Sequence, residues 1–591
     1  MGIMQKALET YEANRDLVGV VRDDHEVLAP IYHIITRAAL EITVNAKGEF
    51  VTACKVGKNE PKFVIPVTES SAGRSSGACA HPLCDKIIYI SPFDAEKHKL
   101  YLEQLEDWTN SEYSHPMLKA ILKYVKGGSI IQDLMKLSLI KSEELTKDEG
   151  GMLVRWRVNG IGAESGPCWT NKALFEAYSK WYISKNENEE KNLCMISGEY
   201  TQIARLHARG VVAMKGKAKI ISSNDNDNFT YLGRFTDASQ AATIGTAASQ
   251  KAHNTLHWLV TEQGASEVYG GRTFICWNPE RKKICHPTGP FGMLDSKNSS
   301  LTDYKRELKR ILEGYKAEFA GDQEGVVTAA LDAATPGRLA ITYYSEMTGD
   351  DFFERLYNWD LTCCWNNGSY GVQPPLLRNI INCAYGTVRK EWLETDDSIM
   401  AQQMQGLLSC RLDGAKIPKG LVKRLADRAS NPQAYDDKIW YRILFTACAV
   451  INKYQNDYKE ENAMAWSLDK HDRSFQFGRL LAVMDRAEKD YYSKTGEDRQ
   501  TNAIKSMSVF RQRPWSTYER VNRQLQQAYI GRLGQCSKIR YSKLTEEIVN
   551  IIKDFPENEL NRPLDDTYLL GYDMQRNEFF KSNKENETEE K

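Results

Sequence analysis

Hydrophobic and polar positions alternate with a period of two in short runs over roughly the first 365 residues. In the segment 152–158 (MLVRWRV), Val154, Trp156 and Val158 fall on one face and two arginines on the other. This alternation is typical of a half-buried strand. The same pattern predicts strands in four further segments, 50–56, 63–67, 273–277 and 339–344. Charged stretches such as 184–192 separate the runs and are predicted to be loops.

Beyond residue 374 the strand signals vanish and helical periodicity replaces them. One apolar stripe with helical spacing contains Leu480, Val483, Met484 and Ala487. A second stripe contains Leu544, Ile548, Ile551, Ile552 and Phe555. Such stripes bury best against one another, so we expect a helical bundle. The longest apolar stretch, 439–451, is predicted to be a buried helix.

The two patterns together predict an α+β fold. A mixed N-terminal α/β region with several short sheets is followed by a C-terminal all-α helical bundle. We divide the chain into an α+β body, a helical connecting region, a C-terminal helical bundle and a disordered tail of charged and small polar residues. These four parts cover residues 1–365, 366–460, 461–580 and 581–591, respectively.

Length and composition place the chain among multidomain globular proteins. It has 591 residues, of which 41% are hydrophobic and 27% charged, an ordinary balance for a chain that folds around more than one core. The formal net charge is only −1, which excludes a protein with a global basic field. Any binding of a polyanion must therefore depend on local basic patches.

The cysteines and the lack of long apolar runs indicate where in the cell the protein is expected. The 13 cysteines are scattered and odd in number, which fits reduced thiols in the cytoplasm better than a disulfide framework. Residues 1–14 predict an amphipathic helix without the apolar core or cleavage site of a signal peptide. No run of about 18 apolar residues occurs, so we expect no contact with a membrane.

The segment 202–220 (QIARLHARGVVAMKGKAKI) is basic and contains no acidic residue. Its five cations are Arg205, Arg209, Lys215, Lys217 and Lys219. A contact with a phosphate requires little more than a positive charge at the right position along the backbone. These side chains are therefore candidates for binding a nucleic-acid backbone. A solvated basic face would have the same composition.

The segment 501–545 is more strongly basic, with nine basic residues against Glu519 alone. The basic residues are Lys505, Arg511, Arg513, Arg520, Arg523, Arg532, Lys538, Arg540 and Lys543. Aromatic residues interleave with them, at Phe510, Trp515, Tyr518, Tyr529 and Tyr541. On a helical bundle this pattern predicts a positive stripe over an apolar base, which would follow a nucleic-acid strand electrostatically without reading its sequence.

A short loop, 70–77 (SSAGRSSG), carries one arginine among glycines and serines. Small residues let a backbone approach a DNA groove closely, and arginine can donate to base edges or enter a narrow minor groove. Arg74, Ser75, Ser76 and Gly77 are therefore candidates for reading a DNA motif. A plain flexible loop is the alternative.

The motifs that resemble catalytic or metal sites all lack an essential part. In 210–217 (GVVAMKGK) five residues instead of four separate the glycines, and Ala218 replaces the Ser or Thr of a phosphate-binding loop. His253 and His257 have metal-ligand spacing, but no Glu follows the first, so we predict a surface or core-edge pair. Cys79, His81 and Cys84, with Cys54 as a fourth ligand, match no common zinc knuckle. We expect no metal and no cofactor.

Two further motifs are predicted to be structural. Asp472, beside His471, is placed to cap the helix that follows it. The adjacent Cys363 and Cys364 lie in an aromatic setting and are predicted to be inert buried thiols. With no catalytic residue identified, we expect a protein that is not an enzyme. Two alternatives stay open, a metal-dependent nuclease that uses His471 and Asp472, and a scaffold that binds proteins only.

Seven segments, taken in order, resemble the large subunit of the subtype I-C CRISPR Cascade, a guide-RNA surveillance complex of bacterial antiviral defence. They are 74–85 (RSSGACAHPLCD), 194–207 (CMISGEYTQIARLH), 337–344 (GRLAITYY), 375–378 (PLLR), 477–484 (FGRLLAVM), 503–515 and 568–575 (YLLGYDMQ). Together they sample nearly the whole chain. The ending 571–575 (GYDMQ) lacks the histidine expected of the family, and 233–236 (GRFT) fits the family pattern only loosely.

The resemblance implies a non-catalytic subunit beside the 5′ end of the guide RNA. Such a subunit recognises the protospacer-adjacent motif in double-stranded DNA, stabilises the R-loop with its displaced single strand, and recruits the separate helicase-nuclease. Its other implied partners are the Cascade backbone and RNA-processing subunits and the small subunit. The C-terminal helical part resembles that small subunit, and Met464 is a candidate internal start for producing it separately.

The resemblance also suggests separate tasks for two of the basic elements. The loop with Arg74, Ser75 and Ser76 would contact the protospacer-adjacent duplex. The C-terminal arginines would contact the non-target strand or the guide–target duplex, and they are Arg511, Arg513, Arg520, Arg523, Arg532 and Arg540.

Overall fold

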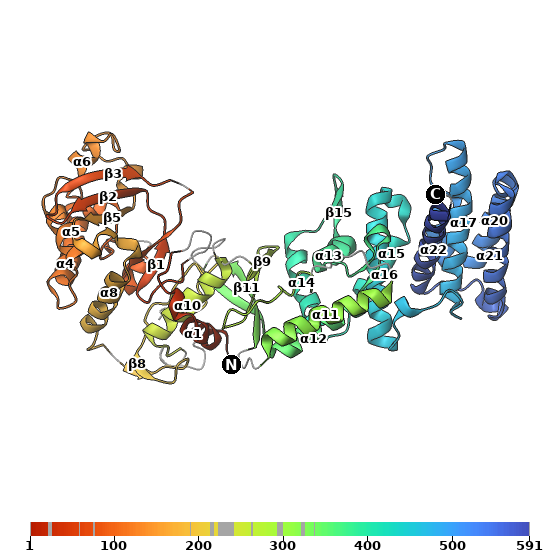
Figure 1. Ribbon diagram of the computed structural model, residues 1–591, viewed down its shortest axis with the longest axis horizontal. Coiled ribbons are helices and arrows are strands. Elements are labelled where there is room, and N and C mark those ends of the chain that lie inside the picture. The colour runs from red at the N-terminus through yellow and green to blue at the C-terminus, as the bar shows by residue number, and fades with distance from the viewer. Residues whose placement is uncertain are drawn as a thin grey trace. The chain divides into compact units, whose positions relative to one another are not determined.

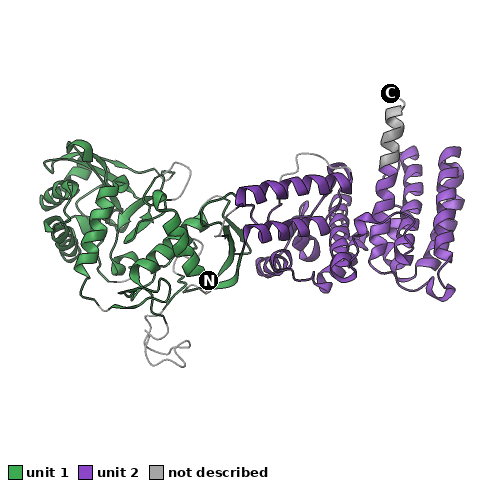
Figure 2. Ribbon diagram, turned by 60° about the horizontal axis from the view of Figure 1, so that its bottom comes forward, with its two compact units in different colours: residues 1–283, 323–347 green, residues 284–322, 348–591 purple. Residues whose placement is uncertain are grey.

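Two units make up the chain (Figure 2). Unit 1 comprises residues 1–283 and 323–347, and unit 2 comprises residues 284–322 and 348–591. The structure is a computed structural model that describes residues 2–21, 27–57, 59–74, 77–189, 191–212, 218–222, 242–261, 264–291, 300–320, 325–335 and 337–589. Unit 1 contains helices and short sheets, and unit 2 is mainly helical (Figure 1), so the predicted α+β class is confirmed.

The first sheet of unit 1 forms around the strand predicted from its alternating pattern. Its strand order is β3-β2-β5-β6, with β2 parallel to β5 and the other pairs antiparallel. The strands are β2 (Leu40–Asn45), β3 (Phe50–Lys55), β5 (Val154–Asn159) and β6 (Gly166–Pro167). Val154, Trp156 and Val158 are fully buried under α5 (Pro116–Lys126), which packs on β2 and β5. On the opposite face Arg155 and Arg157 share the carboxylate of Glu41, each at 2.7 Å.

The second sheet of unit 1 is antiparallel, in the order β12-β11-β10-β9. Its strands are β9 (Ser266–Tyr269), β10 (Arg272–Trp277), β11 (Val326–Thr335) and β12 (Arg338–Met347). The helix α10 (Thr246–Thr261) packs Leu256 against Ile275 and Val327 of this sheet, and α1 (Ile3–Ala13) packs along α10. All of the strands predicted from period two are therefore confirmed.

The remaining elements of unit 1 are short strand pairs and helices. The pairs are β1 (His33–Thr36) with β4 (Phe63–Pro66), and β7 (Lys191–Leu193) with β8 (Tyr200–Gln202). The helices are η1 (Arg15–Leu17), α2 (Glu69–Ala72), α3 (Ile87–Ile90), α4 (Ala95–Asn110), α6 (Ile130–Lys136), α7 (Lys147–Gly150), η2 (Gly162–Glu164), η3 (Cys168–Thr170) and α8 (Lys172–Lys185).

Buried histidines predict that unit 1 is sensitive to acid. Burial lowers the pKa of His33 and of His81 to about 4, and that of His207 to about 3. In the unfolded chain each would titrate near pH ~6.5, so below that pH protons bind preferentially to the unfolded state. Folding stability is therefore present above pH ~6.5 and is lost as the pH falls, by about 2 kcal/mol for each histidine at pH ~5.

Pulse proteolysis at neutral and at mildly acidic pH measures this loss of folding stability. The quantity followed is the amount of cleavage within unit 1. The variant His33→Asn is the matched control, since its amide can replace the bond of His33 Nδ1 to the carbonyl of Ile31 but does not titrate. It should lose the part of the pH dependence that His33 contributes. Equal stability of wild-type unit 1 at both pH values would contradict the prediction.

The first part of unit 2 consists of helices, and the buried side chain of Arg411 connects several of its segments. Its helices are α11 (Leu301–Phe319), α12 (Gly349–Thr362), η5 (Gly368–Tyr370), α13 (Leu377–Tyr385), α14 (Asp397–Leu412), α15 (Lys419–Ala429), η6 (Pro432–Ala434), α16 (Asp437–Lys459) and η7 (Ala463–Ala465). Arg411 of α14 donates to Asp360 of α12 at 2.8 Å and to the carbonyl oxygens of Pro287 and Gly289 at 2.7 and 2.6 Å. These bonds tie the segment that leads into α11 to the helices that follow β12 in the sequence.

Two strand pairs also lie in unit 2, and one of them corrects the sequence analysis. β13 (Trp365–Asn366) pairs with β14 (Val372–Gln373), and β15 (Thr387–Arg389) pairs with β16 (Trp392–Glu394). The expectation that strands vanish beyond residue 374 is therefore wrong. Of the six residues in the second pair, Leu393 alone is buried, so the hairpin carries no alternation that a sequence pattern could reveal.

The C-terminal helices of unit 2 pack around α17 (Arg473–Thr495), which contacts α20, α21 and α22. The bundle also contains α18 (Asn502–Lys505), α19 (Met507–Gln512), α20 (Pro514–Ala528), η8 (Ile530–Arg532), α21 (Gln535–Lys553), η9 (Glu557–Glu559) and α22 (Thr567–Glu589). The predicted stripe of α17 is buried throughout. In α21, Ile548 and Ile552 are buried and Leu544 and Ile551 are half-buried. Phe555, the last residue of the predicted stripe, is half-buried and lies just beyond the end of this helix.

Two glycines set the crossing of α17 and α22. A Cβ atom on Gly478 would lie 1.8 Å from the carbonyl oxygen of Tyr568, and one on Gly571 would lie 2.0 Å from that of Phe475. Side chains at these positions would collide with backbone, so the two helices can approach this closely only through glycine. Both glycines belong to segments that carry the resemblance, 477–484 and 568–575.

The finer division of the chain stays a prediction. The boundaries at 365, 460 and 580 describe parts with different expected tasks. α22 continues to Glu589, into the segment predicted to be a disordered tail. Among the described residues, no helix is both long and apolar enough to span a membrane.

Candidate nucleic-acid interface

Arg74, the central residue of the predicted loop, faces the interior of unit 1. Its guanidinium forms a bidentate ion pair with Asp85, with Nη1 2.8 Å from Oδ2, and Nη1 also donates to the carbonyl oxygen of Cys79. The ring of Tyr89 lies 4.6 Å from its Cζ. The side chain of Arg74 is 14% exposed and that of Asp85 is fully buried. The ion pair therefore closes the loop 74–85 upon itself.

Asp85 organises the same loop through its backbone. Its carboxylate accepts the N–H groups of His81 and Lys86, each at 2.7 Å. Arg74 thus acts in this structure as a residue that positions the loop. Gly77, at the exposed end of the loop, has φ +82° and open space where a Cβ would lie, while Ser75 and Ser76 lie outside the described residues. That these residues read a DNA motif stays a prediction.

The basic segment 202–220 lies against this loop, although the two are far apart in the sequence. Nη2 of Arg209 donates to the carbonyl oxygen of Arg74 at 3.1 Å. Arg209 and Lys219 face each other in an antiparallel bridge, which the N–H of Gly210 extends by donating to Ala218. Arg205 is exposed. Two segments that were predicted independently thus form one basic surface, which we call the loop surface.

The loop surface contains a cavity of about 200 Å³, which we call the Arg209 pocket. It lies between α2, the segment 204–209 and α10. Its lining includes Glu69, Gly73, His207, Arg209, Lys219 and Ser249. Burial lowers the pKa of Lys219, and the positive charge of Arg209 lowers it further, while Glu69 opposes this effect. The like charges of the pocket are therefore only partly compensated.

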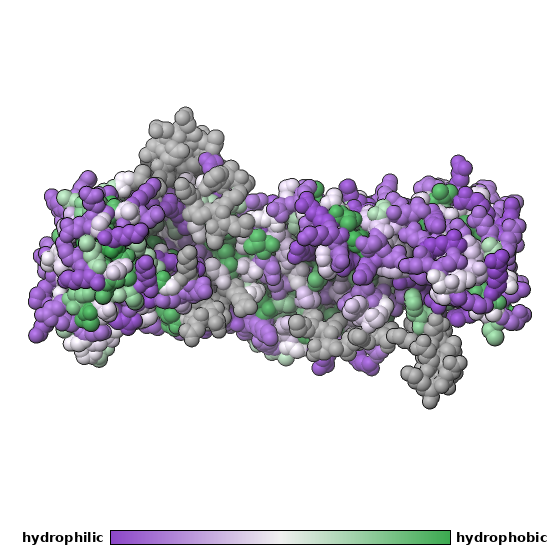
Figure 3. Space-filling view, turned by 90° about the horizontal axis from the view of Figure 1, so that it is seen from above, coloured by the Kyte–Doolittle hydropathy of each residue, from purple (hydrophilic) through white to green (hydrophobic). Residues whose placement is uncertain are grey.

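Three C-terminal arginines form an exposed basic surface. Arg513 is the residue that immediately precedes α20, and Arg520 and Arg523 follow on that helix. The intervals of seven and three residues place them along one side of it. Within the described part of the chain, none of these three guanidinium groups forms a hydrogen bond or ion pair. We call these three exposed arginines the α20 surface. Figure 3 shows one face of the C-terminal bundle, on which hydrophilic residues predominate.

The other basic candidates of the bundle differ from these three. Arg511 is held by Asp427 and Asp566 and is 13% exposed, so its charge is neutralised within unit 2. Arg532 donates to the hydroxyl of Tyr491 at 3.1 Å, and Arg540 lies over the ring of Phe579. Lys505 is exposed, whereas Lys215 and Lys217 lie outside the described residues.

The aromatic residues of this segment form the apolar base that the sequence predicted. Phe510 is fully buried, Tyr518 and Tyr541 are nearly so, and Trp515 is half-buried. Trp515 packs edge-on against Phe477, within the bundle. The basic side chains therefore carry the exposed charge, and these aromatic rings stabilise the helices beneath them.

One basic surface escaped the sequence analysis. Lys416 and Lys419 both lie over the ring of Tyr458, 4.8 and 4.9 Å from its centroid, and Lys423 and Arg424 are exposed beside them. Because Asp413 and Asp427 lie close by in the sequence, this segment does not stand out as a run of basic residues without acidic ones. The interval of three and then four residues between the lysines was the signal that could have revealed it.

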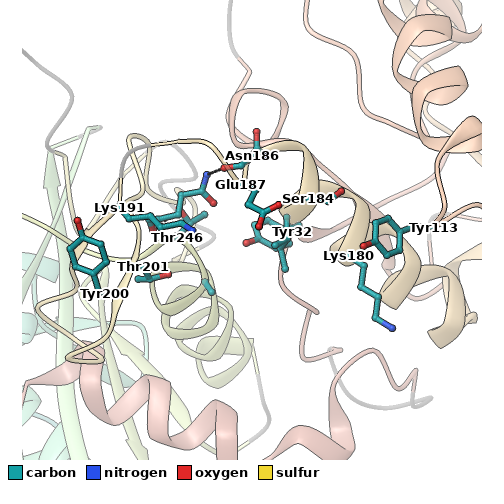
Figure 4. A pocket seen from close by; sticks show the side chains of 13 residues that line it. Tyr32, Tyr113, Lys180, Ser184, Asn186, Glu187, Lys191, Tyr200, Thr201 and Thr246 are labelled. Carbon is teal, nitrogen blue, oxygen red and sulfur yellow. Dashed lines mark hydrogen bonds between the residues drawn. The ribbon is translucent and has the colours of Figure 1, made fainter.

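A larger groove of unit 1 has a different chemistry (Figure 4). It measures about 540 Å³ and is lined by the end of α8, the pair β7–β8 and the start of α10. Tyr200, which is 73% exposed, lies at one end, and Tyr113 and Lys180 lie at the other (Figure 4). Lys191 and Glu187 also line it. Because both signs of charge are present, the groove carries no argument for a polyanion.

The residues considered as metal or catalytic ligands have structural contacts. Nδ1 of His81 lies 3.0 Å from Oγ of Ser71, and Cys84 is buried. His471 stacks on Phe555, and Asp472 accepts the N–H of Phe475 at 2.8 Å as the predicted cap of α17. Among the described residues, no group of three or more histidine, cysteine, aspartate and glutamate side chains could hold a metal ion.

The remaining sequence predictions concern buried side chains. His253 of α10 is buried and bonds to Ser249, while His257 is half-buried, which confirms a core-edge pair. Cys363 and Cys364 are fully buried, and burial raises the pKa of both thiols, as expected for inert cysteines.

Comparison with known proteins places the chain in a family. No curated protein matches it significantly. The family model of the CRISPR-associated protein (Cas_Csd1) matches residues 9–580, nearly the whole chain. The match spans both units, and it agrees with the ordered segments that resemble a CRISPR large subunit. The chain therefore belongs to the CRISPR-associated (Cas_Csd1) family and acts in CRISPR–Cas defence.

Proposed function

We propose that the chain is the non-catalytic large subunit of a type I-C Cascade complex. In that role it recognises the protospacer-adjacent motif in double-stranded DNA, stabilises the R-loop and recruits the helicase-nuclease. The observation that carries the proposal is the convergence of the loop 74–85 and the basic segment 202–220 on the loop surface, through the bond from Arg209 to Arg74. Family membership supports the CRISPR part of the proposal.

The geometry of the loop surface suits recognition of a short duplex motif. Base pairing with the guide RNA reads the target, so the protein needs to read only a few base pairs and to hold the backbone. A loop that is closed by the Arg74–Asp85 ion pair presents its glycine-containing end in a fixed position. Arg205 and Arg209 lie beside that loop as cations for the adjoining phosphates.

The α20 surface has the properties of a site for a single strand. Its three guanidinium groups are exposed, lie along one side of a helix and are free of intramolecular partners in the described part of the chain. Such cations bind phosphates without reading bases. We assign this surface, together with Arg532 and Arg540, to the displaced non-target strand.

Charge reversal tests this assignment. In the variant R513E/R520E/R523E, we expect R-loop formation by the reconstituted complex to depend less on salt. Each lost phosphate contact on a single strand removes about 0.7 from the slope of log affinity against log salt concentration, so the slope should flatten by about 2. The measurement is R-loop formation by gel shift over a range of salt concentrations.

The matched control is R306E/K309E/R310E, which reverses three exposed cations of α11 in the same unit. It should leave the slope unchanged. If the α20 variant has the wild-type slope, the surface does not contact the strand. If the purified wild-type chain shifts no nucleic acid at low salt, the chain is a protein-only scaffold.

A further inference from the structure

The Arg209 pocket brings two like charges together in a half-buried place. Arg209 and Lys219 are paired across an antiparallel bridge, where like charges directly opposite each other are destabilising. The one anion in the described lining is Glu69, and its carboxylate already accepts the backbone N–H of Leu206. Part of the positive charge in the pocket is therefore left for another anion to compensate.

A buried histidine adds an unused polar group to the same pocket. His207 is 5% exposed, and its Nδ1 lies 2.8 Å from Oγ of Ser249, whereas its Nε2 has no partner among the described residues. Nδ1 of His253 lies 2.7 Å from the carbonyl oxygen of Ser249, which can only accept, so that nitrogen carries the proton. The Ser249 hydroxyl is then placed to donate to Nδ1 of His207, which leaves Nε2–H of His207 as a donor.

The pocket has room for a small tetrahedral anion. Its volume of about 200 Å³ is several times the ~30 Å³ that one water occupies in the liquid. Gly73, in the loop next to Arg74, lines the same cavity, and a Cβ on Gly73 would meet nothing within 4 Å. Arg209 keeps most of its five N–H donors after donating one to the carbonyl of Arg74.

We propose that the Arg209 pocket binds one phosphate group of a nucleic-acid backbone. Arg209 and Lys219 neutralise the phosphate, and Nε2–H of His207 donates a buried hydrogen bond to it. This inference rests on the proposed function and deepens it, because it names the ligand group and adds neutral His207, as a hydrogen-bond donor, to the two cations that the sequence indicated. Since Arg209 also holds the backbone of Arg74, a bound phosphate fixes the motif-reading loop at a defined distance from the DNA backbone.

Thermal unfolding of the full-length chain tests the pocket without the rest of the complex. The probes are thymidylyl-thymidine, which offers one phosphodiester, and inorganic phosphate. We expect thymidylyl-thymidine to raise the melting temperature of the wild-type chain. In K219M, which keeps the aliphatic stem and removes the charge, binding should weaken about tenfold or more. Without ligand, K219M should melt at a higher temperature than wild type, because a repelled, half-buried charge is gone.

Two variants of His207 isolate its hydrogen bond. Glutamine can place an N–H near the position of Nε2, whereas asparagine can replace only the bond of Nδ1 to Ser249. H207Q should keep the response to thymidylyl-thymidine and H207N should lose most of it. K191M, in the neighbouring groove, is the control and should respond as wild type does.

Three outcomes would overturn the inference. They are an equal response of K219M and wild type, a response to inorganic phosphate without one to thymidylyl-thymidine, and loss of the response in K191M. The failures of the two proposals are distinguishable. If the assembled complex ignores the DNA motif while the chain still binds thymidylyl-thymidine through Lys219, the proposed function is wrong and the pocket stands.

Discussion

Replacing Gly478 by alanine is expected to cost the C-terminal bundle about 3 kcal/mol or more. The added methyl group would lie 1.8 Å from the carbonyl oxygen of Tyr568 and 2.8 Å from the backbone nitrogen of Tyr572. Backbone atoms cannot avoid the clash by changing rotamer, so α17 and α22 must separate along their whole contact. Gly571→Ala should have the same effect, because its Cβ would lie 2.0 Å from the carbonyl oxygen of Phe475.

Urea unfolding of the full-length chain, followed by hydrogen exchange in α17 and α22, measures this cost. Gly406→Ala is the matched control, since Gly406 lies inside α14 of the same unit and a Cβ there would meet nothing within 4 Å. That substitution should stabilise the chain by about 0.5–1 kcal/mol. If Gly478→Ala left exchange in both helices unchanged, the close crossing would not exist in solution.

Removing either partner of the Arg74–Asp85 ion pair is expected to cost unit 1 about 3–5 kcal/mol. Asp85 is fully buried, so Arg74→Ala leaves an uncompensated carboxylate inside the protein. Asp85→Asn leaves the guanidinium of Arg74 without its counter-charge. The double variant should cost less than the sum of the two single variants, because neither charge then remains unpaired.

The same pair of variants separates positioning of the loop from contact with DNA. If Arg74 acts by closing the loop, Asp85→Asn should weaken motif-dependent DNA binding as much as Arg74→Ala does, although a buried carboxylate cannot touch the duplex. Arg205→Ala, an exposed control, should change the free energy of unfolding by less than about 0.5 kcal/mol. Loss of binding in Arg74→Ala with full binding in Asp85→Asn would mean that Arg74 itself contacts the DNA.

Much of the fold could be predicted from local patterns. The period of two located β3, β4, β5, β10 and β12, and the helical stripes located α17 and α21, because apolar residues recur there at the spacing of a strand or a helix. The pattern did not show how deeply some of these elements are buried: β4 is buried at every position, β10 at five of six, and α17 over most of its length. The hairpin β15–β16 could not be found this way, since five of its six strand residues are exposed. The sequence also placed the cap of α17 at Asp472, an interaction between neighbouring residues.

The candidate site was harder to predict, because its decisive contacts join residues that are distant in the sequence. Basic composition drew attention to Arg74, Arg209 and Arg511, and it could not show that two of them are held by carboxylates. Asp566, which holds Arg511, lies 55 positions away. The bond from Arg209 to the backbone of Arg74 spans 135 positions. Gly478 and Gly571 stood in segments that carried the resemblance, and only their contact explains why glycine is required there.

The central claim is that the chain gives a Cascade complex its dependence on a DNA motif and does not itself cut DNA. The complex would be reconstituted with and without the chain and mixed with plasmids in which the bases flanking the target are randomised, in the presence of Mg²⁺ or Mn²⁺. We predict R-loops on a restricted set of flanking sequences, only when the chain is present, with both DNA strands intact. Cleavage by the purified chain, or R-loops that form equally on all flanking sequences, would contradict this account.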